Sequence, residues 1–202
     1  MINRNLIIEN QYFAPVIFYY ELNSSTNCIF DIYDSYQKMS FRNRCTISGA
    51  NGVIHLSVPL VGGRNQKRQM LEVRIDNKKN WQANHWKSIT SCYNKSPWFD
   101  HYRNELQRIY EHKYDSLMEW DLVCNQWICD KMSIKTPLEL STSYIKKYDE
   151  ANFSDWRSRL RPSTIHSTYP QVTRYPQVFE ERVGFIPNLS ILDKLFCDGN
   201  KL

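Results

Sequence analysis

The stretch from Trp81 to Leu106, WQANHWKSITSCYNKSPWFDHYRNEL, decides how the middle of the chain folds. Its apolar residues recur every three or four positions, which is the spacing of one face of an α-helix. At about 100° per residue, His85 falls on the same side as Trp81 and Ile89, so its side chain is expected to point into the protein. An inward histidine can be a core residue bonded to a neighbouring carbonyl, or a general base in a site. The spacing alone leaves both interpretations open.

A second helix is expected directly after the first. Ser96 can cap its first turn, and Pro97 suits the first helical position, where no amide hydrogen bond is needed. Trp98, Tyr102 and Leu106 then repeat at helical spacing. Two helices with so short a link are expected to form an antiparallel pair with the aromatic side chains packed between them.

The amino-terminal part is predicted to form a compact βαβ unit, with strands at residues 6–8 and 29–33 and a helix at 16–22. Strands joined in this way run parallel, so the residues that follow them meet at one edge of the sheet, where open α/β sheets bind ligands. The side chains expected at this edge are Asn10, Gln11, Tyr12, Asp34 and Gln37.

A β-hairpin is predicted around Asn51-Gly52, because this pair supplies the positive φ angles of a tight turn. Its strands cover residues 44–47 and 54–60, and alternation along the second strand places His55 on a polar face. A further strand is predicted at residues 71–75, where apolar and charged residues alternate.

The remaining elements complete a single α/β domain over residues 1–202, with a mixed β-sheet and packed helices. A third helix is expected after Asp115 as its cap, and a last short strand at 137–140. An ordered Pro-, Ser- and Thr-rich loop covers about 161–178. A final helix then begins after the cap Ser190 and ends at Gly199.

Composition narrows the possible functions. The six cysteines contain no CxxC pair, so reduced, buried thiols are expected and a zinc site or other metal site is not. No apolar run approaches the about 18 residues of a membrane span, and the first residues do not resemble a signal sequence, so we expect a cytoplasmic protein without a membrane partner. The formal net charge of +5 is modest, and no nucleic-acid-binding module is present. We therefore expect no nucleic acid partner.

Several enzyme signatures are missing, namely the GxxxxGK[ST] and GxGxxG loops, HExxH and GxSxG. What remains is a set of polar residues at strand ends together with His85. Arg42-Asn43-Arg44 can hold an anionic group through two guanidinium forks, although charges on an edge strand would give the same pattern. The Arg157/Arg159/Arg161 run is more typical of a solvated loop.

The ordered pieces of the chain resemble the WbqC-like protein family of bacteria. The motifs that carry this resemblance are Gln11-Tyr12-Phe13-Ala14-Pro15, Tyr33-Asp34, Arg42-Asn43-Arg44, Leu56-Ser57-Val58-Pro59, His85-Trp86, residues 93–99 and residues 185–193. The tail looks like the variant found in Bacteroidetes-type bacteria. Because genes of this family often accompany those for surface polysaccharide, notably O-antigen, the resemblance implies a role in that pathway without naming a reaction.

Together these observations favour a small-molecule transferase of the acyl, aminoacyl or glycosyl type. In this hypothesis His85, with Asp34 or Asp31, is the catalytic base, and Arg42 and Arg44 hold an anionic donor. The side chains expected to bind the donor or a sugar-like acceptor are Gln11, Tyr12, Gln37, Arg42, Asn43, Arg44, Tyr93 and Trp98. The alternative is a non-catalytic binding or scaffold protein of the same pathway. The residues indicate neither a cofactor nor an oligomeric state.

Overall fold

The predicted βαβ unit is present in the computed structural model, which describes residues 5–202. Strand β1 (Asn5–Ile8) leads into helix α1 (Val16–Ser24) and then into strand β2 (Cys28–Phe30). The two strands pair in parallel, with Leu6 opposite Cys28. Strand β2 is shorter than the predicted 29–33, because the chain turns after Phe30. In this turn the Asp31 carboxylate accepts hydrogen bonds from the backbone amides of Tyr33 and Asp34.

Two further short strands complete a parallel sheet with the order β5-β2-β1-β6. Strand β5 (Leu138–Leu140) confirms the prediction at 137–140. Strand β6 (Phe153–Asp155) was not predicted, because three half-buried residues are too few to show an alternating pattern. All four strands run the same way, so their carboxyl ends lie at one edge of the sheet.

The predicted hairpin is confirmed as strands β3 (Arg44–Gly49) and β4 (Gly52–Ser57), which pair in antiparallel fashion. Gly52 takes the positive φ of 110° that the turn requires. His55 is exposed, as expected, and its Nδ1 lies 3.2 Å from the Thr46 hydroxyl on the neighbouring strand. The α/β class with both parallel and antiparallel strands is thus confirmed.

The strand predicted at residues 71–75 is wrong. A 3-10 turn covers Met70–Glu72 instead, and the Glu72 carboxylate accepts from the backbone amide of Gln69, which closes the turn. Beyond the turn, Ile75 pairs with Leu60 only as an isolated bridge. Alternating side chains therefore mark a segment held between the hairpin and the following helices rather than a strand.

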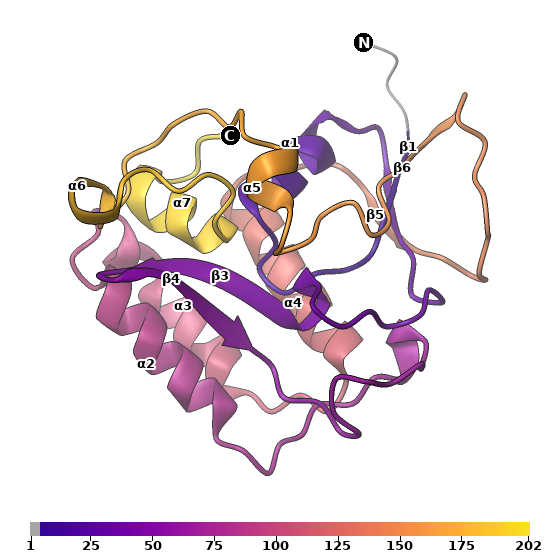
Figure 1. The fold of residues 1–202 in the computed structure, drawn as a ribbon, viewed down its shortest axis with the longest axis horizontal. Coiled ribbons are helices and arrows are strands. Elements are labelled where there is room, and N and C mark those ends of the chain that lie inside the picture. Colours follow the sequence, from indigo (N-terminus) through magenta and orange to yellow (C-terminus); the bar gives the residue numbers. More distant parts are fainter. Residues whose placement is uncertain (1–4) are drawn as a thin grey trace.

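Helices α2 (Trp81–Tyr93) and α3 (Phe99–Glu111) form the expected neighbouring pair, and α4 (Leu117–Lys131) follows them. Trp86 fills the space between the first two, with its ring 6.0 Å from those of Phe99 and Tyr110. Figure 1 shows this pair lying beside the hairpin.

Two of the predicted helix caps are wrong. Helix α3 begins later than predicted, because the Ser96 hydroxyl donates to the carbonyl of Tyr93 instead of capping the next turn. In α4 the cap is Ser116, one residue after the predicted Asp115, and its hydroxyl accepts from the amide of Glu119.

The carboxyl-terminal segment packs back onto the body through the short helices α5 (Ile165–Thr168) and α6 (Glu180–Val183) and the longer α7 (Ile191–Asp198). Within the Pro-rich stretch at 161–178, Ile165 and Tyr175 are buried, as expected of an ordered loop. Helix α7 has the predicted cap, since the Ser190 hydroxyl accepts from the amide of Leu192.

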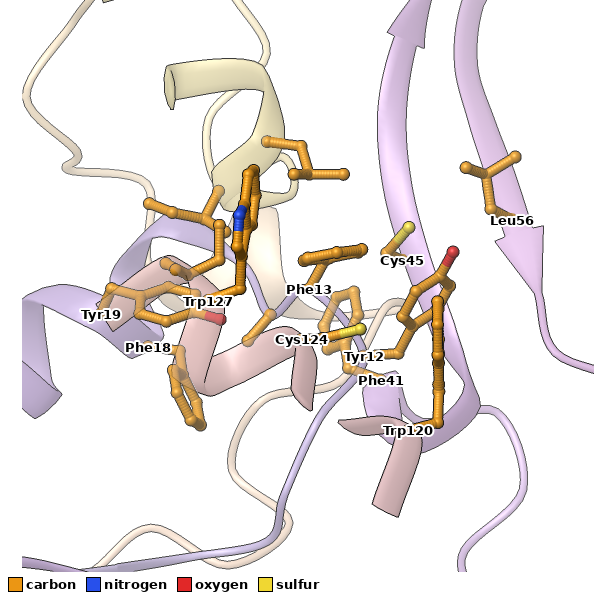
Figure 2. Packing of buried hydrophobic residues seen from close by; sticks show 14 of the residues in the cluster. Tyr12, Phe13, Phe18, Tyr19, Phe41, Cys45, Leu56, Trp120, Cys124 and Trp127 are labelled. Carbon is orange, nitrogen blue, oxygen red and sulfur yellow. The ribbon is translucent and has the colours of Figure 1, made fainter. Parts of the chain in front are cut away.

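The core between these layers is rich in aromatic side chains. Figure 2 shows Tyr12 and Phe13, which follow β1, packed against Trp120 and Trp127 of α4. All six cysteines are free thiols and buried, as predicted.

Candidate functional site

Charged side chains gather where the parallel strands end. Glu9 follows β1, Asp31 follows β2, and Asp155 is the last residue of β6. Arg42 reaches Glu9, and Asp34 in the loop after β2, from a 3-10 turn, Phe41–Asn43, whose first turn is capped by the Ser40 hydroxyl. The edge predicted from the sequence is therefore occupied by carboxylates and guanidinium groups in close contact.

Arg42 is the centre of this group although its side chain is fully buried. Its Nη2 lies 2.5 Å from Oδ2 of Asp34 and 3.8 Å from Oε2 of Glu9, and its Nη1 donates to the carbonyl of Ser35 at 2.6 Å. Burial raises the pKa of Glu9, against the opposing effect of the Arg42 charge. The guanidinium thus holds Asp34 in a fixed orientation.

Arg157 makes a second ionic group beside the first. Its guanidinium donates to Asp31 at 2.8 Å and to Asp155 at 2.6 Å. Burial alone would raise the pKa of Asp155, but the hydrogen bonds and the charge of Arg157 bring it below its usual value. Arg157 therefore ties the end of β2 to the end of β6.

A cleft of about 380 Å³ opens over these two ionic groups. Its wall contains side chains from the ends of β2 and β6 and from the loop between β5 and β6. These are Asp34, Gln37, Tyr144, Asp155, Arg157, Ser158 and Arg159. Gln11 is fully buried and does not line the cleft, but its side-chain amide donates to the Glu9 carboxylate at 3.1 Å. Four of the predicted site residues, Gln11, Asp34, Gln37 and Arg42, are thus brought together here.

Asn43 and Arg44 line a different cleft, of about 260 Å³, on the side of the hairpin. The amide of Asn43 has structural partners, since it accepts from the Tyr36 hydroxyl at 3.0 Å and donates to the carbonyl of Val58 at 2.8 Å. Arg44 donates to the Ser57 hydroxyl at 3.2 Å.

His85 points inward, as predicted, and lies in the core. Its Nδ1 is 2.9 Å from the hydroxyl of Tyr12, which in turn lies 2.5 Å from the hydroxyl of Tyr110. Burial lowers the pKa of His85 to about 4, although a backbone hydrogen bond with Ser57 acts in the opposite direction. The imidazole is therefore neutral at neutral pH and connects the core to the wall of the hairpin cleft, to which Ser57 belongs.

Tyr93 and Trp98 lie elsewhere, beside α7. The Tyr93 hydroxyl is buried and donates to Asp193 at 2.6 Å. Trp98 is 43% exposed and its ring faces Gly199. The residues expected to line one pocket thus occupy four places: the sheet edge, the hairpin cleft, the core at His85 and Tyr12, and the contact with α7.

Comparison with known proteins decides the family. A model of the WbqC-like protein family matches residues 11–169. The chain belongs to the WbqC-like protein family. The match includes Asp34 and Arg42 of the first ionic group and the whole of the Arg157 group, whereas Glu9 precedes the matched residues. No curated protein and no solved structure matches the chain.

Sequence reasoning missed three charged residues of the WbqC-like site. Glu9 directly follows β1, so the rule that selected Asn10 and Gln11 could have included it. Asp155 was missed because β6 itself was missed. The assignment of Arg157 to a solvated loop was wrong, because its half-buried guanidinium contacts Asp31 and Asp155. The sequence did contain a signal for Asp155 and Arg157: in Phe153-Ser154-Asp155-Trp156-Arg157, a short segment with two aromatic residues carries an acid and a base two positions apart.

Two further polar residues of α4, Asn125 and Asp121, lie close to the residues of the WbqC-like site. The amide nitrogen of Asn125 donates to the Asn10 side chain at 2.6 Å and to the carbonyl of Gln11 at 2.8 Å. One turn earlier, burial raises the pKa of Asp121 well above its usual value, while the charge of Arg42 opposes this. Both carboxylate oxygens of Asp121 are buried and have no hydrogen-bond partner among residues 5–202.

Within residues 5–202 of this WbqC-like protein, no three His, Cys, Asp or Glu side chains are arranged to hold a metal ion. In the same range, no helix is both long and apolar enough to cross a membrane.

Proposed function

We propose that this WbqC-like protein transfers a group from an activated donor to a small polar acceptor in the assembly of bacterial surface polysaccharide, and that transfer takes place in the cleft at the sheet edge. One observation carries the proposal. Asp34, predicted as a catalytic residue, lies in the wall of that cleft with its carboxylate held by the buried Arg42. A carboxylate fixed in this way suits general-base catalysis.

The proposed chemistry uses the remaining hydrogen-bonding capacity of Asp34. Its Oδ1 accepts from the amide of Ser35 at 2.9 Å and its Oδ2 from Arg42, and each carboxylate oxygen has a second lone pair. An acceptor hydroxyl or amine gives its proton to Asp34 as it attacks the donor. The new bond forms at the transferred group, and the leaving group departs with the electron pair of the bond that breaks.

Asp34 is better placed than His85 to be this base. The side chain of Asp34 is 15% exposed and lines the cleft, whereas His85 is 6% exposed and bonded to Tyr12. We propose that His85 acts as a positioning residue, which orients the Tyr12 hydroxyl and the backbone at Ser57. Stacking on a sugar-like acceptor is proposed for Tyr144, which is 52% exposed in the cleft wall.

The test replaces Asp34 by Asn in a host strain that lacks its own copy of the gene, and analyses the surface glycan by mass spectrometry. The matched control is Asp100→Asn, at an exposed position in the first turn of α3. Purified variants are compared by thermal unfolding, so that loss of the fold is recognised. We expect the wild-type glycan with Asp100→Asn and an altered glycan with a folded Asp34→Asn. A wild-type glycan with both would favour the binding or scaffold role.

A further inference from the structure

The cations of this protein fall into two groups with different surroundings. Arg42 is buried and Arg157 is half-buried, and each contacts two carboxylates. A second group of cations lines two clefts beside the hairpin and forms no salt bridge within residues 5–202. It consists of Lys38, Arg44, Arg64, Lys67 and Lys79. Their charges are available to an anionic ligand.

The two clefts are neighbours with shared walls. The first, of about 260 Å³, contains Arg44, Arg64 and Lys79, and the second, of about 490 Å³, contains Lys38, Arg64 and Lys67. Tyr36 and Arg64 line both. The volumes are close to the roughly 300–1,000 Å³ typical of small-molecule sites.

The clefts differ from the sheet-edge site in their charge balance. In their walls, as far as residues 5–202 are concerned, five cations face a single carboxylate, that of Asp76. The floor of the first cleft is apolar and made of Val58, Pro59 and Leu60. A ligand that fits these walls carries more than one negative charge and an organic part that can cover the apolar floor.

We infer that the paired clefts beside the hairpin bind the diphosphate group of an organic donor. Arginine forks bond phosphate oxygens in pairs, and lysines add point charges, so two groups of cations joined by Arg64 suit two linked phosphates better than one. That the ligand is the donor rests on the proposed group transfer. The arrangement supports this, because Gln37 lines both the second basic cleft and the sheet-edge cleft.

Binding to the whole protein tests the inference directly. Isothermal titration is carried out with inorganic pyrophosphate, UDP, ADP, coenzyme A and a short single-stranded RNA. The variants are Arg64→Gln and Arg44→Gln, with Arg103→Gln on the exposed side of α3 as the matched control. We expect UDP or coenzyme A to bind, with Kd raised about tenfold or more in the first two variants and unchanged in the control. Added salt should weaken binding.

Comparison of the affinities for these ligands shows which class of donor carries the diphosphate. Tighter binding of UDP than of coenzyme A indicates a nucleotide donor, whereas tighter binding of coenzyme A than of both UDP and ADP indicates a pantetheine ester. Binding of RNA alone, binding of none of the small anions, or equal losses in Arg64→Gln and Arg103→Gln would overturn the inference. Asp34→Asn is expected to keep its affinity for the diphosphate ligand, so a failure of the proposed transfer is distinguished from a failure of this site.

Discussion

The fully buried guanidinium of Arg42 lies 2.5 Å from the carboxylate of Asp34, eight residues earlier in the chain. This contact joins the loop after β2 to the turn before β3, and so connects the parallel sheet to the hairpin. Because Oε2 of Glu9 lies 3.8 Å from the same Nη2, one arginine faces carboxylates from the segments that follow both central strands.

Replacing Arg42 by Ala is expected to lower the free energy of unfolding by about 3–5 kcal/mol, because it leaves the buried Glu9 and the half-buried Asp34 without their cation. Urea denaturation followed by circular dichroism measures this. Arg44→Ala is the control, since Arg44 has only a hydroxyl partner and a distant thioether, and it should cost about 1 kcal/mol or less. Equal losses in the two variants would contradict a special role for the buried arginine.

His85 makes stability depend on pH. Its pKa is about 4 in the folded protein and 6.5 when unperturbed, so between these values the unfolded chain binds more protons. The stabilisation is complete above about pH 6.5, and it falls by about 3 kcal/mol as the pH drops to about 4. His85→Gln should remove this fall. Urea titrations of both proteins at several pH values measure it, and parallel profiles would contradict the prediction.

Asp193 has the opposite effect. Burial raises its pKa from 3.8 to about 6, so the folded protein binds more protons between these values and loses stability as the pH rises through them. Asp193→Asn should therefore remove a loss of about 2 kcal/mol between pH 4 and 6. The measurement is again the free energy of unfolding against pH. If the variant kept the wild-type slope in this window, Asp193 would not be its source.

Gly199 ends α7 with a φ of 78° and a ψ of −153°, a conformation that is essentially reserved for glycine. A Cβ added there would lie 3.0 Å from Cε2 of Trp98. Gly199→Ala should therefore cost more than the roughly 1–3 kcal/mol of backbone strain alone. Gly184→Ala is the matched control, because Gly184 has a similar φ of 76° and no atom near the added Cβ. Both are compared by thermal unfolding, and a larger loss at Gly184 would refute the clash.

Local patterns predicted much of this fold, and distant contacts explain what they missed. The Asn51-Gly52 turn and the spacing in α2 depend on neighbouring residues, so both were found. Strand β6 is formed by pairing with β1, which is far away in the sequence. Its three residues, Phe153–Asp155, show no alternation from which a strand could be predicted.

For the candidate site too, local patterns predicted where some residues lie but not which distant residues they contact. Asp34 and Gln37 follow from the rule that parallel strands end at one edge. Arg42 was expected to hold a ligand, but two carboxylates of its own chain occupy it. For His85, helical spacing gives the direction of the side chain, and only the tertiary structure shows that it ends at the hydroxyl of Tyr12.

The burial of all six cysteines has a practical consequence. Burial also raises the pKa of their thiols, so the native protein should react slowly with maleimides. A single accessible thiol introduced as Gln37→Cys would then take up a fluorescent label selectively. Because that position borders both the sheet-edge cleft and the second basic cleft, one dye there would report, in real time, the arrival of a ligand in either.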